Sequence, residues 1–512
     1  MIIESPHDIT IDDVVKVAIH KDHLELSTNA MNAIVDSHKR ILSIVGTGKP
    51  VYGVNTGFGI FADKVISLNS IEKLNRNLII SHAVGIGNPL DPRVVRAAMF
   101  IRAVTLSKGY SGVRPEIIQT LIAMLNQGVT PVIPEKGSLG SSGDLCQLSH
   151  MALVLSKDEQ DLDRESGQAF FRNQVMSGKD AMTLAGIDRI ILSAKEGLAI
   201  NNGATFSAAL GALAVYEAAY LVEVAEIATA LSMEALCARS NALDERIHAV
   251  RRQLGQIETA RNLKKLLRGS TFLDSLDQVQ DAYSIRCAPQ VIGAVRDTIA
   301  FTRTIIEREI NAATDNPLIF ENDEAISGGN FHGEPIGLVM DYLSIAMAEL
   351  GAISERRTFR LTDKKLSQGL PPMLVDDESN AGLQSGLMLP HYTAASLVLE
   401  NQSLATPDSI RSLPTSANQE DHNANAMTAA RHAYEIVGNL RQILSIEIYS
   451  AIRGIELRSR EKSGRLGEGT SKIASKMKEI TPFINGDTLW GEEIMKVNKM
   501  LADHLSSVDD DE

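Results

Sequence analysis

The chain has 512 residues, of which 44% are hydrophobic and only 4% aromatic, and it carries a formal net charge of −14. A chain of this length and composition can bury a large core of aliphatic side chains, which suits closely packed helices. Its acidic residues are scattered, which argues against nucleic acid or an anionic membrane surface as a partner. The one charge block, Asp509–Glu512, is expected to be a solvated end.

Cysteine usage and the N-terminus indicate the compartment. Cys146, Cys237 and Cys287 lie far apart without a CxxC spacing, which favours a reducing environment. The first residues, MIIESPHDIT, lack a basic segment followed by an apolar stretch, and no uninterrupted apolar run approaches the ~20 residues that cross a bilayer. We therefore expect a cytoplasmic protein, and we expect no metal site.

Helical periodicity dominates the chain. The first strong helix, opened by Pro115 and closed by Gly128, carries apolar residues at helical spacing along one face. Longer candidates follow at residues 207–237, about 291–313, 336–359 and 424–457. The first of these is Ala-rich and apolar on most faces, and a helix of that kind is buried. No period of 20 to 50 residues recurs, so a solenoid is not expected.

Short segments rich in Gly, Asn, Ser and Asp separate these helices. They are Tyr52–Gly59, Ser81–Gly87, Gly140–Asp144, Asn201–Gly203, Gln280–Cys287, Asp315–Pro317, Ser327–His332 and Thr415–His422. Each alone is typical of an ordinary turn, because these residue types favour turns for backbone reasons. As a set on a helical frame, they are typical of loops that carry function.

The segment EKGSLGSSGDLCQLSH has a possible chemistry of its own. In a compressed turn, the amide nitrogen of Gly143 can attack the carbonyl carbon of Ser141, and loss of water closes a five-membered ring. Loss of a second water from Ser142 leaves a methylene electrophile. Glycine permits the close approach and serine supplies the leaving hydroxyl. Because a Ser-Gly pair is common, the tripeptide alone does not establish this chemistry.

The wider pattern supports it. The segments YGVNTGFG, SHAVGIG, EKGSLGSSGDL, SGGNFH and SLPTSANQEDH occur in this order between Tyr52 and His422. Together they resemble the histidine ammonia-lyase family of aromatic amino-acid lyases. The resemblance implies that Ser141, Ser142 and Gly143 form a 4-methylidene-imidazol-5-one (MIO) group autocatalytically, so that no external cofactor is needed.

The same resemblance implies an architecture. We expect a mainly α-helical fold with a smaller N-terminal domain over residues 1–110 and a long-helix body over residues 111–512. The expected assembly is a homotetramer with sites shared between chains. The long Ala-rich helices agree with this expectation, since they present more apolar surface than one protomer can cover.

The resemblance also implies roles for individual residues. Tyr52 corresponds to the base that removes the β-proton, which requires cations or hydrogen bonds that stabilise a phenolate. Tyr283 and Arg286 correspond to the pair beside the substrate carboxylate, which an arginine can bind through two parallel hydrogen bonds. A tyrosine that only packs and an arginine on a helix surface are the structural alternatives.

Three further positions correspond to groups around the cofactor. Asn202 and Gln280 are expected to orient the cofactor and the substrate, and Phe331 is expected to lie beside the cofactor. Buried amides that satisfy backbone groups are the structural alternative for the first two.

Substrate choice is expected to depend on His82 and Glu420, which stand where the histidine-specific branch of the family has His and Glu. An imidazole both donates and accepts hydrogen bonds, so a carboxylate and an imidazole facing it make physical sense. A lone histidine on a half-apolar helix face is more often structural. The pairing with Glu420 is what favours a histidine substrate.

The chain also departs from the family pattern. Ser141 stands where Ala is usual, and its hydroxymethyl group could form a hydrogen bond near the ring. The other departures near the expected pocket are Cys146, Gln147, Asn201, Ala204, Thr205 and Ala282. The loss of a proline at position 147 removes a rigid φ constraint next to the cyclising turn. These changes suggest that the pocket has been retuned.

Three functions are consistent with the sequence. The first is an ammonia-lyase that converts L-histidine to urocanate by β-elimination. The second is an aminomutase, or a lyase for a related amino acid, with the same cofactor. The third is a non-catalytic helical scaffold. The joint presence of seven residues argues against it: Tyr52, His82, Ser142, Gly143, Tyr283, Arg286 and Glu420.

Overall fold

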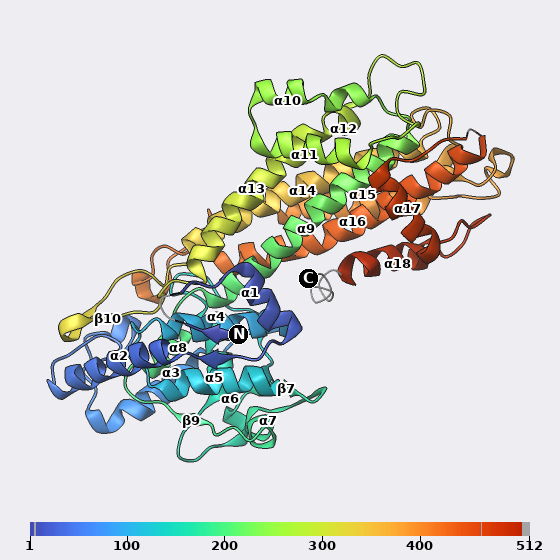
Figure 1. Cartoon of the computed structure of the whole chain (residues 1–512). Helices are drawn as coiled ribbons and strands as arrows, with labels where there is room; N and C mark the ends of the chain where they lie inside the picture. Colours follow the sequence, from blue (N-terminus) through green and yellow to red (C-terminus); the bar gives the residue numbers. More distant parts are fainter. Residues whose placement is uncertain (5–6, 462, 504–512) are drawn as a thin grey trace. The chain divides into compact units, whose positions relative to one another are not determined.

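The computed structural model describes residues 1–4, 7–461 and 463–503, and the acidic tail 509–512 lies outside them. With 61% helix and 8% strand, the chain has the mainly α-helical fold that its sequence predicts. It divides into two compact units (Figure 1). Unit 1 comprises residues 1–216, 303–341 and 407–431, and unit 2 comprises 217–302, 342–406 and 432–512. The expected N-terminal domain over residues 1–110 is a different kind of division from these two units, and its boundary stays a prediction.

Unit 1 combines helices with small sheets. Its helices are α1 (Ile11–Val15), α2 (Thr28–Gly46), α3 (Ile71–His82), α4 (Pro92–Ser107), α5 (Pro115–Gln127), α6 (Leu145–Leu155), α7 (Gly178–Leu184) and α8 (Glu196–Asn201). Its strands are β1 (Ile2–Ile3), β2 (Glu25–Leu26), β3 (Ile86–Pro89), β4 (Thr130–Pro131), β5 (Pro134–Lys136), β6 (Ser156–Lys157), β7 (Gln168–Phe171), β8 (Gln174–Ser177), β9 (Ile190–Ile191), β10 (Leu318–Phe320) and β11 (Glu324–Ile326). They pair as β1–β2, β3–β5, β4–β7–β8, β6–β9 and β10–β11.

The long helices occur where the sequence predicts them. They are α9 (Thr205–Ala235), α13 (Ala288–Glu309), α14 (Glu334–Thr362) and α16 (Ala426–Glu461), and four of the five boundaries between the units fall inside them. The remaining helices of unit 2 are α10 (Glu245–Arg251), α11 (Leu254–Leu266), α12 (Tyr283–Arg286), α15 (Met388–Leu404), α17 (Glu468–Ile480) and α18 (Trp490–Ala502). Local signals explain several ends: α5 begins at Pro115 and ends before Gly128, which has a left-handed φ of 79°.

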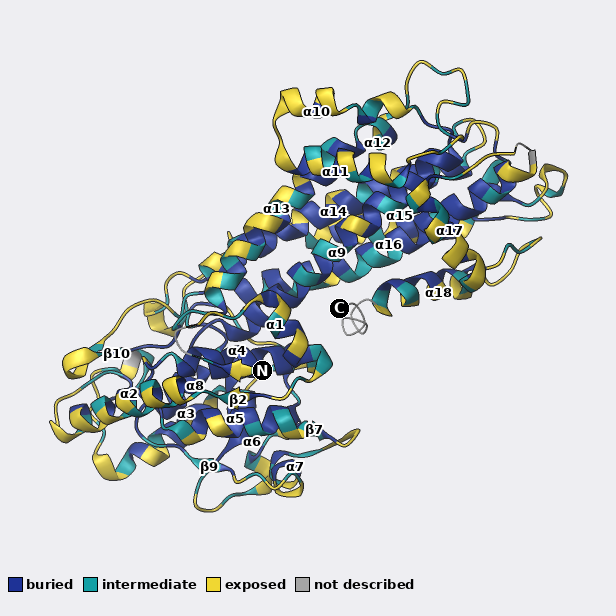
Figure 2. Ribbon diagram, viewed as in Figure 1, coloured by how far each residue is buried: buried dark blue, intermediate teal, exposed yellow. Residues whose placement is uncertain are grey.

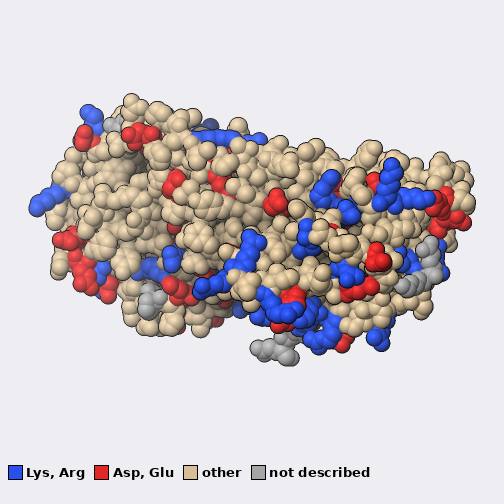
Figure 3. Space-filling model, turned by 90° about the horizontal axis from the view of Figure 1, so that it is seen from above, with Lys and Arg blue, Asp and Glu red and all other residues tan. Residues whose placement is uncertain are grey.

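The two most apolar long helices are core elements. By length and composition α9 and α14 could each cross a bilayer, but 78% and 72% of their most apolar windows are buried inside the structure. Figure 2 shows α9 dark blue along most of its length. A helix that is apolar on most faces is stable in water only when other elements cover it. These two helices therefore belong to the core of the folded chain. On the face shown in Figure 3, acidic and basic side chains are interspersed over an otherwise uncharged surface.

A buried ion pair holds the long helices of unit 2 together. Glu447 of α16 accepts hydrogen bonds from Arg357 and Ser354 of α14 and from Ser232 of α9, at 2.5 to 2.8 Å. Arg357 and Glu447 are both fully buried. The same guanidinium donates to the carbonyl of Ser284 in α12 at 3.4 Å. Because every charged group has partners, the core tolerates the pair.

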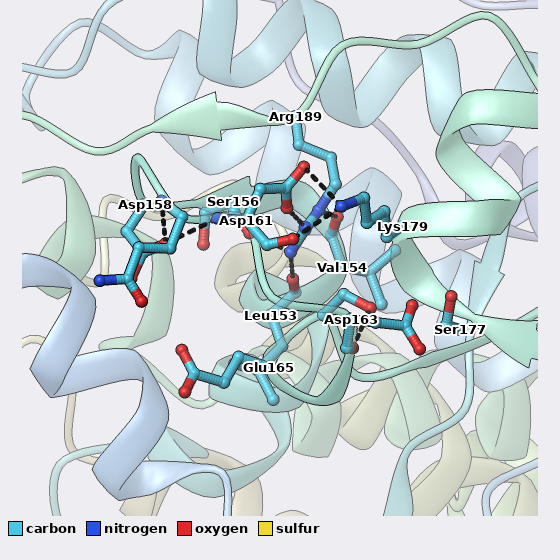
Figure 4. Close-up of polar contacts among 12 residues, drawn as sticks. Leu153, Val154, Ser156, Asp158, Asp161, Asp163, Glu165, Ser177, Lys179 and Arg189 are labelled. Atoms are coloured by element: carbon cyan, nitrogen blue, oxygen red, sulfur yellow. Dashed lines mark hydrogen bonds and ion pairs between the residues drawn. The ribbon is translucent and has the colours of Figure 1, made fainter.

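Arg189 anchors the C-terminal end of α6, the helix that directly follows the Ser-Gly turn. Its guanidinium donates to the carbonyls of Leu153 and Val154 at 2.7 and 3.1 Å and also contacts Ser156 and Asp161 (Figure 4). These are carbonyls that a helix end leaves without intrahelical partners. Burial lowers the pKa of Arg189 to about 10, so it stays charged at neutral pH.

Candidate active site

A cavity of about 1370 Å³ opens in unit 1. Seven of the residues that the sequence predicts for the site line it: Tyr52, His82, Ser141, Ser142, Asn202, Phe331 and Glu420. They come from six separate segments of the chain, so the fold brings together most of the predicted loops.

Backbone hydrogen bonds gather those loops around the Ser-Gly turn. β3 pairs with β5 in antiparallel register, with Ile86 opposite Lys136, so the segment after His82 lies beside the segment before the turn. Directly before the turn, the carbonyl of Gly140 accepts a hydrogen bond from the amide of Gly333 at 2.9 Å, and the carbonyl of Leu139 accepts one from the amide of Asn425 at 2.8 Å. Main-chain pairing therefore fixes the register of the loops independently of their side chains.

The turn itself is clamped against a second glycine. Gly143 has a φ of +80° and forms a parallel bridge with Gly203. A Cβ atom on Gly143 would lie 2.0 Å from the carbonyl carbon of Gly203, so both the backbone conformation and the available space require glycine here. The carbonyl of Ser142 accepts hydrogen bonds from the side chain of Asn202 at 2.7 Å and from the amide of Gly203 at 3.2 Å.

Asp144 ties this turn to the start of α9. Its fully buried carboxylate accepts a hydrogen bond from the Ser207 amide at 2.8 Å and from the hydroxyls of Ser138 and Ser207 at 2.7 to 3.0 Å. Burial raises the pKa of Asp144, and these hydrogen bonds oppose that shift. The carboxylate therefore fixes both ends of the turn to one buried point.

Glu420 reaches the turn from a strained loop. Ser416, Ala417 and Asn418 all have left-handed φ values between 49° and 67°, a conformation that costs a residue with a side chain roughly 1 to 2 kcal/mol. A two-way backbone pairing of Thr415 with Glu420 closes this loop. The Glu420 carboxylate accepts hydrogen bonds from the hydroxyl of Ser141 at 2.6 Å and from the hydroxyl of Ser142 at 2.9 Å. Such loops are characteristic of functional sites.

The electrostatics around Glu420 affect the two aromatic side chains that face the cavity. Burial raises the pKa of Tyr52, and the charge of Glu420 adds to the increase, although a backbone hydrogen bond from Gly59 opposes it. Burial lowers the pKa of His82, whereas Glu420 opposes that change. His82 is therefore neutral at neutral pH, and its Nδ1 lies 3.0 Å from the Ser81 hydroxyl. A Tyr52 phenolate would need additional stabilisation beyond what these neighbours provide.

Three predicted site residues belong to unit 2 and are absent from the cavity lining: Gln280, Tyr283 and Arg286. Tyr283 is 70% exposed. The guanidinium carbon of Arg286 lies 4.8 Å from the centre of the Tyr283 ring. In the described part of the chain, the Arg286 Nε forms no hydrogen bond.

The family departures mostly lie away from the cavity. Gln147, Asn201, Ala204 and Thr205 are all buried, but none of them lines it. Asn201 donates to the Ser149 hydroxyl at 3.2 Å, and Thr205 accepts a hydrogen bond from Arg102. Ser141 is the departure that does line the cavity. The four buried departures can therefore affect the cavity only through the residues that line it.

Several contacts of the site have no signal in the local sequence. The pattern predicts Gly203 in a loop, and the structure places it against Gly143. The rings of His332 and His422, which line the cavity, stack in parallel with their centres 5.9 Å apart. Both histidines fall inside the quoted motifs, so motif membership was the available signal. No sequence signal connected Ser138 and Ser207 to Asp144, because the contact depends on tertiary packing.

Comparisons with known proteins agree with this geometry. The model of the aromatic amino acid lyase family matches residues 9–479. The chain is 47% identical over 488 residues to a histidine ammonia-lyase of Caldanaerobacter subterraneus subsp. tengcongensis, covering 94% of this chain and 93% of the relative. The crystal structure of histidine ammonia-lyase from Trypanosoma cruzi is 38% identical with a TM-score of 0.89, covering 98% of this chain and 94% of that one.

A second reaction type also occurs among similar structures. The phenylalanine aminomutase of Pantoea agglomerans is 32% identical with a TM-score of 0.91, over 98% of this chain and 99% of that one. The fold is therefore common to enzymes with different outcomes. In the structure, the Ser141–Gly143 turn and the Glu420 carboxylate meet at one cavity. Because, in addition, the family model matches nearly the whole chain, this chain belongs to the aromatic amino acid lyase family.

Proposed function

We propose that this enzyme is an ammonia-lyase that converts L-histidine to urocanate and ammonia. One observation carries the substrate assignment: His82 and the Glu420 carboxylate line the same cavity as the Ser141–Gly143 turn. A carboxylate accepts the imidazole N–H of a substrate, and a neutral imidazole can donate or accept a second hydrogen bond. The full-length similarity to histidine ammonia-lyases supports the same substrate.

The residues of the turn fit an MIO group formed from Ser141, Ser142 and Gly143. Ring closure would join the Gly143 nitrogen to the Ser141 carbonyl carbon, and that oxygen would leave as water with the amide hydrogens of Ser142 and Gly143. The Ser142 hydroxyl and its Cα hydrogen would leave as a second water. Such a group supplies an electrophile that turns the substrate amine into a leaving group. Asn202 and Gly203 already hold the Ser142 carbonyl in place.

The remaining residues bind the substrate and move its protons. Tyr52 removes the β-proton. Because the pKa of its phenol is raised, the MIO group and the substrate ammonium would have to stabilise its phenolate. Phe331 provides an apolar wall of the cavity. Glu420 orients the imidazole and accepts or returns a proton there.

The decisive experiment is an assay of the purified protein with L-histidine. We expect an increase in urocanate absorbance with an equal amount of released ammonia. A β-amino acid without net ammonia would instead assign the chain to the aminomutases, which the likeness to the phenylalanine aminomutase keeps as the second candidate. Absence of both products would leave a non-catalytic scaffold. Intact-mass measurement of the same sample should give a chain about two waters lighter than its sequence mass, and Ser142→Ala should abolish the difference.

The assembly we propose is a cytoplasmic homotetramer. Large apolar side chains are exposed on two helices of unit 2: Tyr342 and Ile345 on α14, and Leu389, Tyr392 and Leu399 on α15. Exposed apolar residues on neighbouring turns are typical of an interface. Light scattering should give the mass of a tetramer, and an active monomer would overturn this assembly.

Gln280, Tyr283 and Arg286 would then complete the cavity of a neighbouring subunit. A subunit-mixing experiment tests this arrangement. Tyr52→Phe and Tyr283→Phe chains should each be nearly inactive, but their co-expression should restore part of the activity, because some sites then combine an intact Tyr52 with an intact Tyr283. A mixture as inactive as its components would show that both tyrosines act from one chain.

A further inference from the structure

The hydroxyl group of Ser141 is not consumed when the MIO group forms, so it remains available for another role. Ring formation would use the carbonyl carbon of Ser141, whereas it would eliminate the hydroxyl of Ser142 as water. Before ring formation, the Glu420 carboxylate accepts both hydroxyls, that of Ser141 through Oε2 at 2.6 Å and that of Ser142 through Oε1 at 2.9 Å. Afterwards the Ser142 donor is gone. The Ser141 hydroxyl remains, and Oε1 becomes available.

The Ser141 hydroxyl has few alternatives to this contact. Ser141 is 6% exposed, which limits the water that could compete for its hydroxyl. Within the described part of the chain, its hydroxyl makes this hydrogen bond and no other. Hydrogen bonds to an ionised group are shorter and stronger than neutral ones, and 2.6 Å lies in the range for a hydroxyl and a carboxylate.

The backbone of Glu420 does not fix the direction of its carboxylate, which therefore depends on the hydrogen bond from Ser141. Thr415 pairs with the main chain of Glu420, which fixes where the residue starts but not where its carboxylate points. Three side-chain torsions lie between the main chain and the two oxygens, and each can occupy several rotamers. A donor on Oε2 selects the rotamer in which Oε1 faces the cavity.

We infer that Ser141 is a positioning residue, whose hydroxyl holds Glu420 Oε2 so that Oε1 alone is presented to the imidazole of the substrate. This inference rests on the proposed function, because it concerns how Glu420 meets that ring. Ser141 does not touch the reacting atoms. It acts through Glu420 and makes the carboxylate an acceptor with one defined direction.

A double-mutant cycle tests the inference with Ser141→Ala, Glu420→Gln and the double variant. Two readouts are measured for each chain: kcat/KM for L-histidine, and the dissociation constant for urocanate by calorimetry. We expect Ser141→Ala to weaken both by about fivefold, the value of one net hydrogen bond. In the Glu420→Gln background the same substitution should change either readout by less than about twofold. Ser141→Thr, which keeps the hydroxyl, should behave like the wild type.

Intact mass separates this inference from the function on which it rests. Ser141→Ala should still be about two waters lighter than its sequence mass, since only its carbonyl enters the ring. An equal effect of Ser141→Ala in both backgrounds, or no effect in either, would overturn the positioning role while leaving the lyase intact. A wild-type chain that neither forms urocanate nor binds it would overturn the proposed function itself.

Discussion

The side-chain amide of Asn202 donates a 2.7 Å hydrogen bond to the backbone carbonyl of Ser142, sixty residues away in the chain. The same carbonyl accepts the amide of Gly203 at 3.2 Å. Two donors therefore hold the central residue of the turn.

Asn202→Asp should disrupt this hold. The substitution replaces a donor with a carboxylate that repels the Ser142 carbonyl, and Asn202 is 3% exposed, so water cannot relieve the repulsion. We expect a chain of full sequence mass and a loss of activity of at least about a hundredfold. Asn77→Asp is the matched control, because Asn77 lines the same cavity but is exposed. Equal effects of the two substitutions would contradict the prediction.

Gly143→Ala tests the packing of the turn. The added methyl group would lie 2.0 Å from a backbone carbon of Gly203, at a φ of +80°. Combined strain and overpacking should cost roughly 3 to 5 kcal/mol of unfolding free energy, and the ring should not form. Gly128→Ala is the control, because Gly128 has a φ of +79° with no atom within 4 Å. Denaturation should show only about 1 to 2 kcal/mol for the control.

Glu420→Gln and His82→Leu test substrate selection. The first removes the carboxylate charge without changing shape, so kcat for histidine should fall at least ten- to a hundredfold, while the mass stays about two waters below the sequence mass. The second removes the polar ring and should raise activity on phenylalanine relative to histidine. Asp421→Asn, a change to the next carboxylate on the same cavity, should leave histidine turnover within about twofold. Unchanged histidine kinetics in both test variants would exclude histidine as the selected substrate.

Glu309 should make stability depend on pH. Burial, reinforced by the charge of Asp144 and opposed by Arg102, raises the pKa of this α13 carboxyl to about 7. Between pH 4.5 and 7 the folded chain keeps the proton that the unfolded chain loses, so stability falls as pH rises through this window. Glu309→Gln should match the wild type near pH 4 and exceed it by up to about 3 kcal/mol above pH 7.5. Urea unfolding at several pH values would measure the difference, and a gap independent of pH would refute it.

Arg189→Ala should loosen the end of α6. Its guanidinium is 3% exposed and binds the carbonyls of Leu153, Val154 and Ser156. Removing it leaves these acceptors and Asp161 without their partner, which should cost about 3 kcal/mol in urea unfolding. Arg164→Ala, in the same region but with an 81% exposed side chain, should cost less than about 0.5 kcal/mol. Similar losses for both would show that Arg189 contributes no more than a surface charge.

Local patterns account for the elements that the sequence predicts correctly. The helix closed by Gly128 and the buried Ala-rich helix α9 follow from spacing, composition and end signals that act within one turn or two. The identity of the site loops was also readable, because their motifs are contiguous. The sequence alone therefore determined the helical fold class, the loops and the residue types available for chemistry.

Only the tertiary structure decided how those residues meet. The Ser141 hydroxyl and Glu420 are 279 positions apart, and the clamp on Gly143 comes from Gly203. Their contacts depend on packing between segments that fold from distant parts of the chain, for which no local pattern gives a distance. For the same reason, no local pattern shows that Ser141 lines the cavity whereas Gln147 and Asn201 are buried outside its lining.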